Sequence, residues 1–123
     1  MSVSPPVTLD TFLRQLRESP ELVEFDDILA LIDALYRFTP VAFRNGTLRN
    51  AAGQNTGSCK LLAFARLQGL TGQETLACFG HHYRDAVRLH PDGDNHPNIR
   101  NFMASGWAGV VFEADPLAPR QPR

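Results

Sequence analysis

The stretch that decides the fold is GQNTGSCKLLAFARL, residues 53–67. Its first half carries two glycines, an adjacent pair of amides and two hydroxyls, which are residue types that build tight turns. Its second half, from Leu61 to Leu67, is nearly all apolar and predicts a short helix buried on most sides. We therefore expect this helix at the centre of the core, with Cys59 in its first turn.

Two interpretations of Cys59 follow from this position. Unpaired backbone N–H groups and the helix dipole favour a thiolate at the start of a helix, which suits a reactive thiol. Free cysteine is also among the most buried residue types, which suits a small apolar side chain in the core. The residues alone leave both interpretations open.

Composition narrows the class of protein. A chain of 123 residues can form one domain with a single core. A formal net charge of −1 argues against nucleic-acid binding, which uses a clustered basic face. No apolar run approaches the roughly 20 residues of a membrane span, and the N-terminus lacks the basic head and apolar core of a secretory signal. Without such a signal, Cys59 and Cys78 are expected to be reduced thiols.

Helical periodicity covers most of the chain. We expect a lead-in over residues 1–7 and a helix from the Thr8 cap to about residue 19. A second helix begins at Pro20 and includes Tyr36 in its apolar stripe. A capping box at Thr71–Glu74 opens a helix that continues to Leu89, and Pro97 begins another.

The Asn45-Gly46 pair between short mixed runs predicts a hairpin or ribbon over residues 41–49, and residues 109–113 are a candidate for one more short strand. The expected fold is mainly α, a single-domain bundle of about five helices over residues 8–113 with this minor β content. Residues 114–123, rich in Pro and Arg, are expected to form a frayed tail.

Several stretches in this order resemble the HopJ type III effector family of bacterial proteins. They are residues 38–46 (FTPVAFRNG), 53–60 (GQNTGSCK), 76–80 (LACFG), 82–84 (HYR) and 96–103 (HPNIRNFM), with Gly106-Trp107. The resemblance runs from about Leu9 to Phe112. It implies an uncharacterised bacterial protein of the cytoplasm, delivered into a host cell if the effector role holds.

A thiol-dependent hydrolase or transferase is one functional hypothesis. The glutamine before a cysteine at a helix start resembles the papain arrangement, with Cys59 as the nucleophile and Gln54 among the oxyanion donors. The candidate bases are His82 and His96. Partial matches of this kind do not transfer between families, so the hypothesis depends on geometry.

A metal site is a further possibility, because histidines and aspartates crowd residues 81–96. No tight ligand pair such as His-Glu-x-x-His is present, so we expect solvated side chains, no metal and no cofactor.

The favoured hypothesis is a binding module. A helix start with a nearby arginine favours anions, and two polar segments could meet there. The candidate binding residues are Gln54, Asn55, Lys60, Asn98, Arg100 and Asn101. The expected partner is a small anionic ligand or a host or bacterial protein, bound by a monomer or weak dimer. The alternative is that these amides cap buried backbone in long loops.

Overall fold

The structure is a computed structural model that describes residues 8–120. Its helices are α1 (Leu9–Glu18), η1 (Pro20–Leu22), α2 (Phe25–Leu35), α3 (Thr56–Leu67), α4 (Gly72–Ala77), η2 (His82–Val87), α5 (Pro97–Ser105) and η3 (Gly106–Gly109). Its strands are β1 (Tyr36–Phe38), β2 (Phe43–Asn45), β3 (Leu48–Asn50), β4 (Val110–Phe112) and β5 (Leu117–Pro119). The expectation of a mainly helical fold with a small β component is confirmed. The expected lead-in over residues 1–7 lies outside the described residues.

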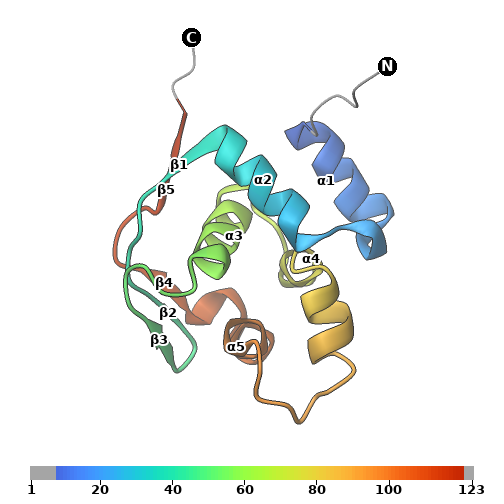
Figure 1. The fold of residues 1–123 in the computed structure, drawn as a ribbon, viewed down its shortest axis with the longest axis vertical. Coiled ribbons are helices and arrows are strands. Elements are labelled where there is room, and N and C mark those ends of the chain that lie inside the picture. The colour runs from blue at the N-terminus through green and yellow to red at the C-terminus, as the bar shows by residue number, and fades with distance from the viewer. Residues whose placement is uncertain (1–7, 121–123) are drawn as a thin grey trace.

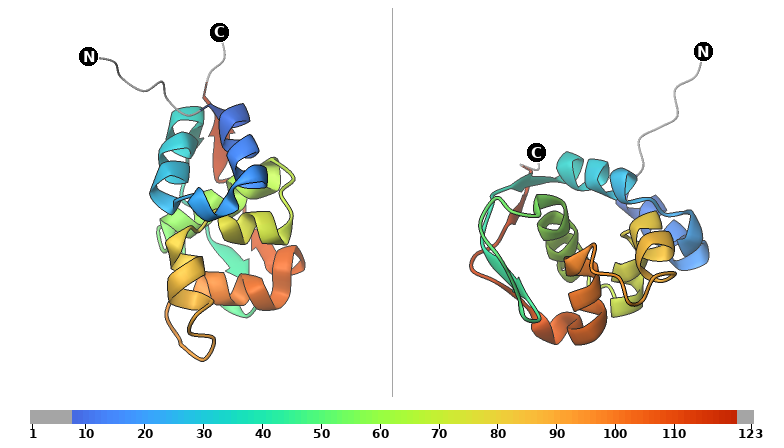
Figure 2. Two further views of the ribbon diagram at one scale, coloured as in Figure 1. Left: turned by 90° about the vertical axis from the view of Figure 1, so that its right-hand side faces the viewer. Right: turned by 60° about the horizontal axis from the view of Figure 1, so that its bottom comes forward.

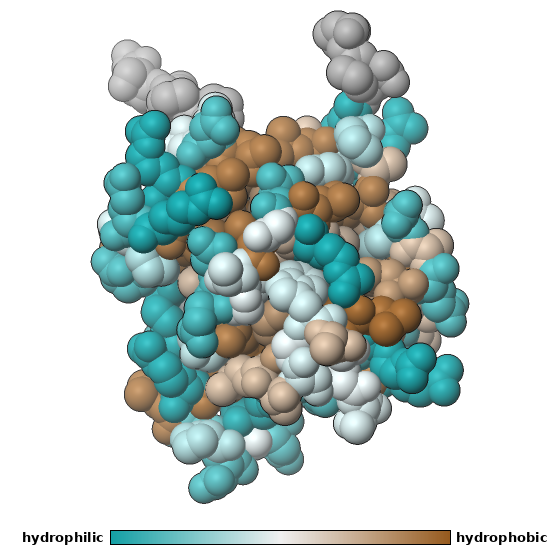
Figure 3. All heavy atoms as spheres, turned by 180° about the vertical axis from the view of Figure 1, so that it is seen from behind, coloured by the Kyte–Doolittle hydropathy of each residue, from teal (hydrophilic) through white to brown (hydrophobic). Residues whose placement is uncertain are grey.

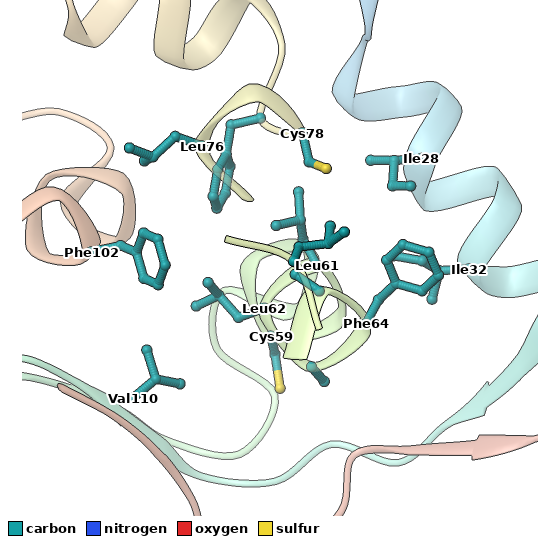
Figure 4. Packing of buried hydrophobic residues seen from close by; sticks show 14 of the residues in the cluster. Ile28, Ile32, Cys59, Leu61, Leu62, Phe64, Leu76, Cys78, Phe102 and Val110 are labelled. Atoms are coloured by element: carbon teal, nitrogen blue, oxygen red, sulfur yellow. The ribbon is translucent and has the colours of Figure 1, made fainter. Parts of the chain in front are cut away.

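Helix α3 is the centre of the molecule, as its apolar sequence predicts. Leu61, Leu62, Phe64 and Ala65 are completely buried. Helices α2, α4 and α5 and the strands surround α3 (Figure 1). Figure 4 shows the side chains of α3 between Ile28 and Ile32 of α2 on one side and Phe102 of α5 on the other. The burial of α3 on most of its faces supplies the main hydrophobic stabilisation of the fold.

The predicted hairpin forms, with its strands spanning residues 43–50 compared with the expected 41–49. Strands β2 and β3 pair antiparallel, with Asn45 opposite Leu48 and a two-residue connection at Gly46-Thr47. Gly46 has φ +62°, which glycine adopts without strain. The candidate strand at residues 109–113 forms as β4 and pairs with the other edge of β2.

Strands β1 and β5 form a second, two-stranded sheet, and two expectations about this part of the chain were wrong. The second helix ends at Leu35, and Tyr36 begins β1 instead of continuing the helical stripe. Within the predicted frayed tail, Leu117–Pro119 instead forms β5, which pairs with β1 and buries Leu117, and residues 121–123 lie outside the described residues. Pro119 is tolerated there because a two-stranded sheet consists of edge strands. The pairing partner of β1 is distant in sequence, so helical periodicity could not show where the helix ends.

The capping box at Thr71 is confirmed, but the helix predicted to reach Leu89 is broken. Thr71 Oγ1 accepts from the Glu74 N–H at 3.1 Å, and the Glu74 carboxylate accepts from the Thr71 N–H at 2.9 Å. Helix α4 ends at Ala77, and Gly80 takes φ +62° before the π-helix η2. A Cβ on Gly80 would lie 2.8 Å from the backbone nitrogen of Phe25, so the break lets α2 approach closely.

The loop that joins η2 to α5 lies at the end of the molecule opposite the start of α1 and the end of β5 (Figure 2). Among the described residues, no helix has the length and hydrophobicity to cross a membrane. The large exposed apolar side chains come from separate elements, and the face in Figure 3 mixes hydrophilic and hydrophobic residues. Apolar side chains exposed singly need no functional explanation.

Candidate ligand pocket between two helix starts

Two residues with left-handed backbone precede α3 and α5. Asn55 has φ 51° and ψ 49°, and His96 has φ 51° and ψ 56°. Within residues 8–120 they are the only non-glycine residues with positive φ. This conformation is uncommon for side-chain-bearing residues, although Asn and His adopt it more often than most. The two strained residues therefore mark the same structural position in two different helices.

The first turns of α3 and α5 lack side-chain caps. The side chains of Asn55 and His96 accept no capping hydrogen bond, whereas Thr8 and Thr71 cap α1 and α4. The first N–H groups of a helix have no partner within the helix. In α5, Pro97 has no N–H and the Ile99 N–H already donates to the His96 carbonyl at 3.0 Å, so the Asn98 N–H is the one left for an external acceptor. In α3 the first-turn N–H groups of residues 56–58 are available, and the positive end of a helix dipole lies behind each start.

Both helix starts border one pocket of about 270 Å³. Its lining residues are Phe25, Asn55, Ser58, Phe79, His82, His96, Pro97, Asn98 and Ile99. No acidic side chain is among them. Phe25 and Phe79 stack with their ring centroids 5.7 Å apart and contribute apolar surface to the pocket, and the two helix starts contribute polar groups.

The imidazole of His82 contacts those of His81 and His96, with the rings tilted against one another, and it also meets Phe25. The ring centroids of His82 and His96 are 5.1 Å apart, those of His81 and His82 are 4.2 Å apart, and Phe25 meets His82 edge-on. Burial lowers the pKa of His82, and the neighbouring His81 and His96 lower it further. His82 is therefore neutral at neutral pH, and it can gain a proton if a negative charge enters the pocket.

A network of asparagine side chains holds two lining residues of the pocket, Asn55 and Asn98, in place. Asn98 Nδ2 donates to Asn50 Oδ1 at 3.0 Å, and Asn98 Oδ1 accepts from Asn45 Nδ2 at 3.0 Å. Asn55 Nδ2 also donates to Asn50 Oδ1, at 2.6 Å. These bonds join the hairpin to the starts of α3 and α5 and so fix the two helix starts relative to each other. Within the described part of the chain, Asn45 Oδ1 is the one buried side-chain polar atom without a partner.

Cys59 does not reach this pocket. The thiol is 1% exposed within the core, and burial raises its pKa to about 11. Figure 4 shows it among core side chains. The thiol hypothesis requires a partly exposed Cys59 next to His82 or His96, whereas Cys59 is buried and Ser58 lines the pocket. Of the two interpretations of Cys59, the structure therefore favours the core side chain.

Four of the candidate binding residues are also held elsewhere. Lys60 Nζ pairs with Asp33 at 2.9 Å. Arg100 donates to Asn95 and to the backbone oxygens of His90 and Pro91, closing the loop before α5. Gln54 accepts from the Ala51 N–H, and Asn101 donates to the Pro97 carbonyl. Lys60 and Arg100 therefore bond to different segments and neither lines the pocket, and the amides at 54 and 101 bond to local backbone.

The structure thus brings together Asn55, Asn98, His82 and His96 from the sequence-based candidates. It adds five lining residues that the sequence analysis did not propose for a site, namely Phe25, Ser58, Phe79, Pro97 and Ile99. The position of Ser58 in the first turn was a usable signal for a helix-start site. No group of three or more potential metal ligands comes together within residues 8–120.

These features define a small, mainly helical domain with a polar pocket at two helix starts. The family model described as HopJ type III effector protein matches residues 9–117. The chain belongs to this family. It is also similar to a solved structure, the crystal structure of the unknown function protein VPA0580, with 46% sequence identity and a TM-score of 0.91. The match covers 98% of this chain and 100% of that chain. No protein with a curated function matches the chain significantly.

Proposed function

We propose that the protein is a binding module whose pocket, between the first turns of α3 and α5, holds a small ligand through a carboxylate or phosphate group. The observation that carries this proposal is the pair of helix starts without side-chain caps on one pocket that no acidic side chain lines. Helix N-termini bind anions through their free N–H groups and the positive end of the helix dipole.

The remaining lining residues suit such a ligand. The Ser58 hydroxyl and the imidazoles of His82 and His96 can each donate a hydrogen bond to an oxyanion. Phe25 and Phe79 offer an apolar wall for the rest of the molecule. Ligand pockets commonly combine apolar walls with a few polar groups that fix orientation.

Backbone strain supports the same site. A non-glycine residue in the left-handed region costs on the order of 1–3 kcal/mol, and such residues cluster at ligand clamps and active sites. Asn55 and His96 are both strained in this way, and both line the pocket. Their backbone conformation turns the chain so that each helix start faces the same space.

The burial of Cys59 argues against a thiol-dependent enzyme. A nucleophilic cysteine needs exposure and a lowered pKa, whereas the thiol of Cys59 is buried and its pKa is raised. The histidines proposed as its base instead contact each other and Phe25.

The variant Ser58→Asp tests the proposed site. A carboxylate in the first turn of α3 would interact favourably with the helix dipole and occupy the place of the bound anion. We expect this variant to keep or raise the melting temperature while sulfate binding, measured by isothermal titration calorimetry, disappears.

Ser58→Asn is the matched control, because it is polar, similar in size and uncharged. It should keep most of the sulfate affinity. If Ser58→Asp binds sulfate as tightly as the unmodified protein, the anion site lies elsewhere and the proposal is wrong.

A further inference from the structure

A second cavity, of about 510 Å³, lies between α1, η1, α4 and η2 and shares no lining residue with the pocket described above. Its volume falls within the range of about 300–1,000 Å³ that is usual for small-molecule sites. Leu16, Pro20 and Ala77 contribute apolar surface to it. The cavity is therefore large enough for a ligand and partly apolar.

Three of the five charged side chains that line this cavity, Arg17, Glu74 and Arg84, already form ion pairs. Arg17 Nε lies 3.5 Å from a carboxylate oxygen of Glu74. Arg84 donates to Glu24 at 2.8 Å and to the carbonyl oxygen of Val23 at 2.9 Å. Within each pair the two charges offset each other, so these groups exert little attraction on a charged ligand.

One basic and one acidic side chain at the cavity have no ion-pair partner among the described residues. Arg88 and Glu21 both line the cavity, and neither forms an ion pair within residues 8–120. The guanidinium of Arg88 lies 5.9 Å from the centre of the Tyr83 ring, an arrangement that restrains its position. Both side chains are exposed to solvent, and a ligand that pairs with both of them carries one anionic and one cationic group.

The π-helical turn η2 positions Arg88 at the cavity. The N–H of Arg88 donates to the carbonyl of Tyr83 at 2.8 Å, the wide hydrogen bond of a π-helix. Such turns are rare and occur frequently at functional sites. Here the turn supplies Tyr83, Arg84 and Arg88 to the same cavity.

We propose that this cavity binds a zwitterion with an apolar body, either a free α-amino acid with an apolar side chain or a short apolar peptide. The ligand carboxylate pairs with Arg88, the ammonium group pairs with Glu21, and the apolar body packs on Leu16, Pro20 and Ala77.

Three probes that share one ring separate the charges: L-phenylalanine, 3-phenylpropionate, which lacks the amine, and 2-phenylethylamine, which lacks the carboxylate. Binding is measured by calorimetry on the full chain. We expect phenylalanine to bind about tenfold more tightly than either truncated probe, which corresponds to about 1.4 kcal/mol.

Two variants assign the charges to residues. Arg88→Gln should weaken phenylalanine and 3-phenylpropionate and leave 2-phenylethylamine unchanged. Glu21→Gln should weaken phenylalanine and 2-phenylethylamine and leave 3-phenylpropionate unchanged. Arg49→Gln and Glu18→Gln, which change exposed residues outside the cavity, are the matched controls and should leave all three affinities as they were.

The dipeptide phenylalanyl-phenylalanine distinguishes the two sources of this chemistry. Tighter binding of the dipeptide assigns the site to peptides, and tighter binding of phenylalanine assigns it to free amino acids. The proposal is overturned if neither the dipeptide nor phenylalanine saturates the protein by about 10 mM. It is also overturned if the two charge variants bind every probe like the unmodified protein.

Discussion

Asn55 and His96 occupy equivalent positions in different parts of the chain: both have φ 51°, both immediately precede a helix, and both line one pocket. Asn98, two residues after His96, shares Asn50 as a hydrogen-bond partner with Asn55. The hairpin thus holds the two helix starts together through side-chain amides. Because the same residues define the pocket and stabilise the fold, changes in binding must be separated from changes in stability.

Anion binding should strengthen as the pH falls. The pKa of His82 is lowered in the free protein, and a bound anion would raise it by favouring the protonated ring. By linkage, the affinity rises as the pH decreases from the bound-state pKa towards the free-state pKa, which lies below the usual value of about 6.5. Sulfate is the suitable probe because its charge is constant over this range, and calorimetry between pH 5 and 8 measures the effect. His82→Gln should flatten the profile, and a profile of unchanged slope would remove His82 from the site.

Replacement of Gly80 by alanine should destabilise the fold more than replacement of Gly69. Both glycines have positive φ, +62° and +69°, so alanine is strained at each. Only at Gly80 would the added Cβ approach backbone, at 2.8 Å from the nitrogen of Phe25, whereas nothing lies within 4 Å at Gly69. We expect a loss of about 1 kcal/mol for Gly69→Ala and clearly more for Gly80→Ala in urea unfolding. Equal losses would mean that α2 does not depend on this close approach.

Asn98→Ala should lower the free energy of unfolding by about 1–3 kcal/mol. The change removes the side-chain partner that Asn45 and Asn50 share, while Asn45 Nδ2 keeps its 2.7 Å bond to the Asn98 carbonyl and Asn50 Oδ1 keeps its bond from Asn55. Chemical denaturation measures the loss. Asn101→Ala is the control, because its side chain bonds in a half-buried position at the same helix, and it should cost much less.

Relief of a like-charge pair should stabilise the hairpin. Arg44 and Arg49 lie directly opposite each other in β2 and β3, both are exposed, and like charges in this arrangement are destabilising. Arg49→Thr should therefore raise the free energy of unfolding by about 0.2–1 kcal/mol at low salt, with a smaller gain at high salt. Arg37→Thr is the control because Arg37 faces Ala118. If both substitutions have the same effect, the benefit comes from threonine rather than from the charge.

Neither cysteine should react in the folded protein. Burial raises the pKa of the Cys59 thiol to about 11 and that of Cys78 to about 12, and both side chains are at most 1% exposed. Alkylation of a Cys78→Ala variant at pH 8 should proceed only after unfolding. Rapid labelling of Cys59 in the native state, with a midpoint below the ordinary thiol pKa of about 8.5, would revive the thiol hypothesis.

Predictions from local sequence signals were correct where interactions between neighbouring residues decide the structure. The Thr8 and Thr71 caps, the apolar α3 and the start of α5 at Pro97 all depend on residues within a few positions of each other. The end of α2 was predicted wrongly because Tyr36 forms β1 by pairing with β5. The break at Gly80 was missed because its cause is contact with Phe25, in a different helix.

The candidate site was also predictable only in part. The sequence identified Asn55, His96 and Asn98 as residues at helix starts, and the structure places all three at one pocket. It could not show that Cys59 faces inward and Ser58 faces the pocket, because that depends on the rotation of α3 about its axis. Nor could it show that Lys60 and Arg100 are already bound to Asp33 and Asn95.

The most direct test of the oxyanion site is an NMR titration of the ¹⁵N-labelled protein with sulfate. Saturable shifts are expected at the backbone N–H groups of residues 56–58 and of Asn98, together with the imidazoles of His82 and His96. The amides near Arg88 and near Arg44 should not move with the same saturation curve. Shifts confined to those arginines, or no saturable shift at the two helix starts, would contradict the account.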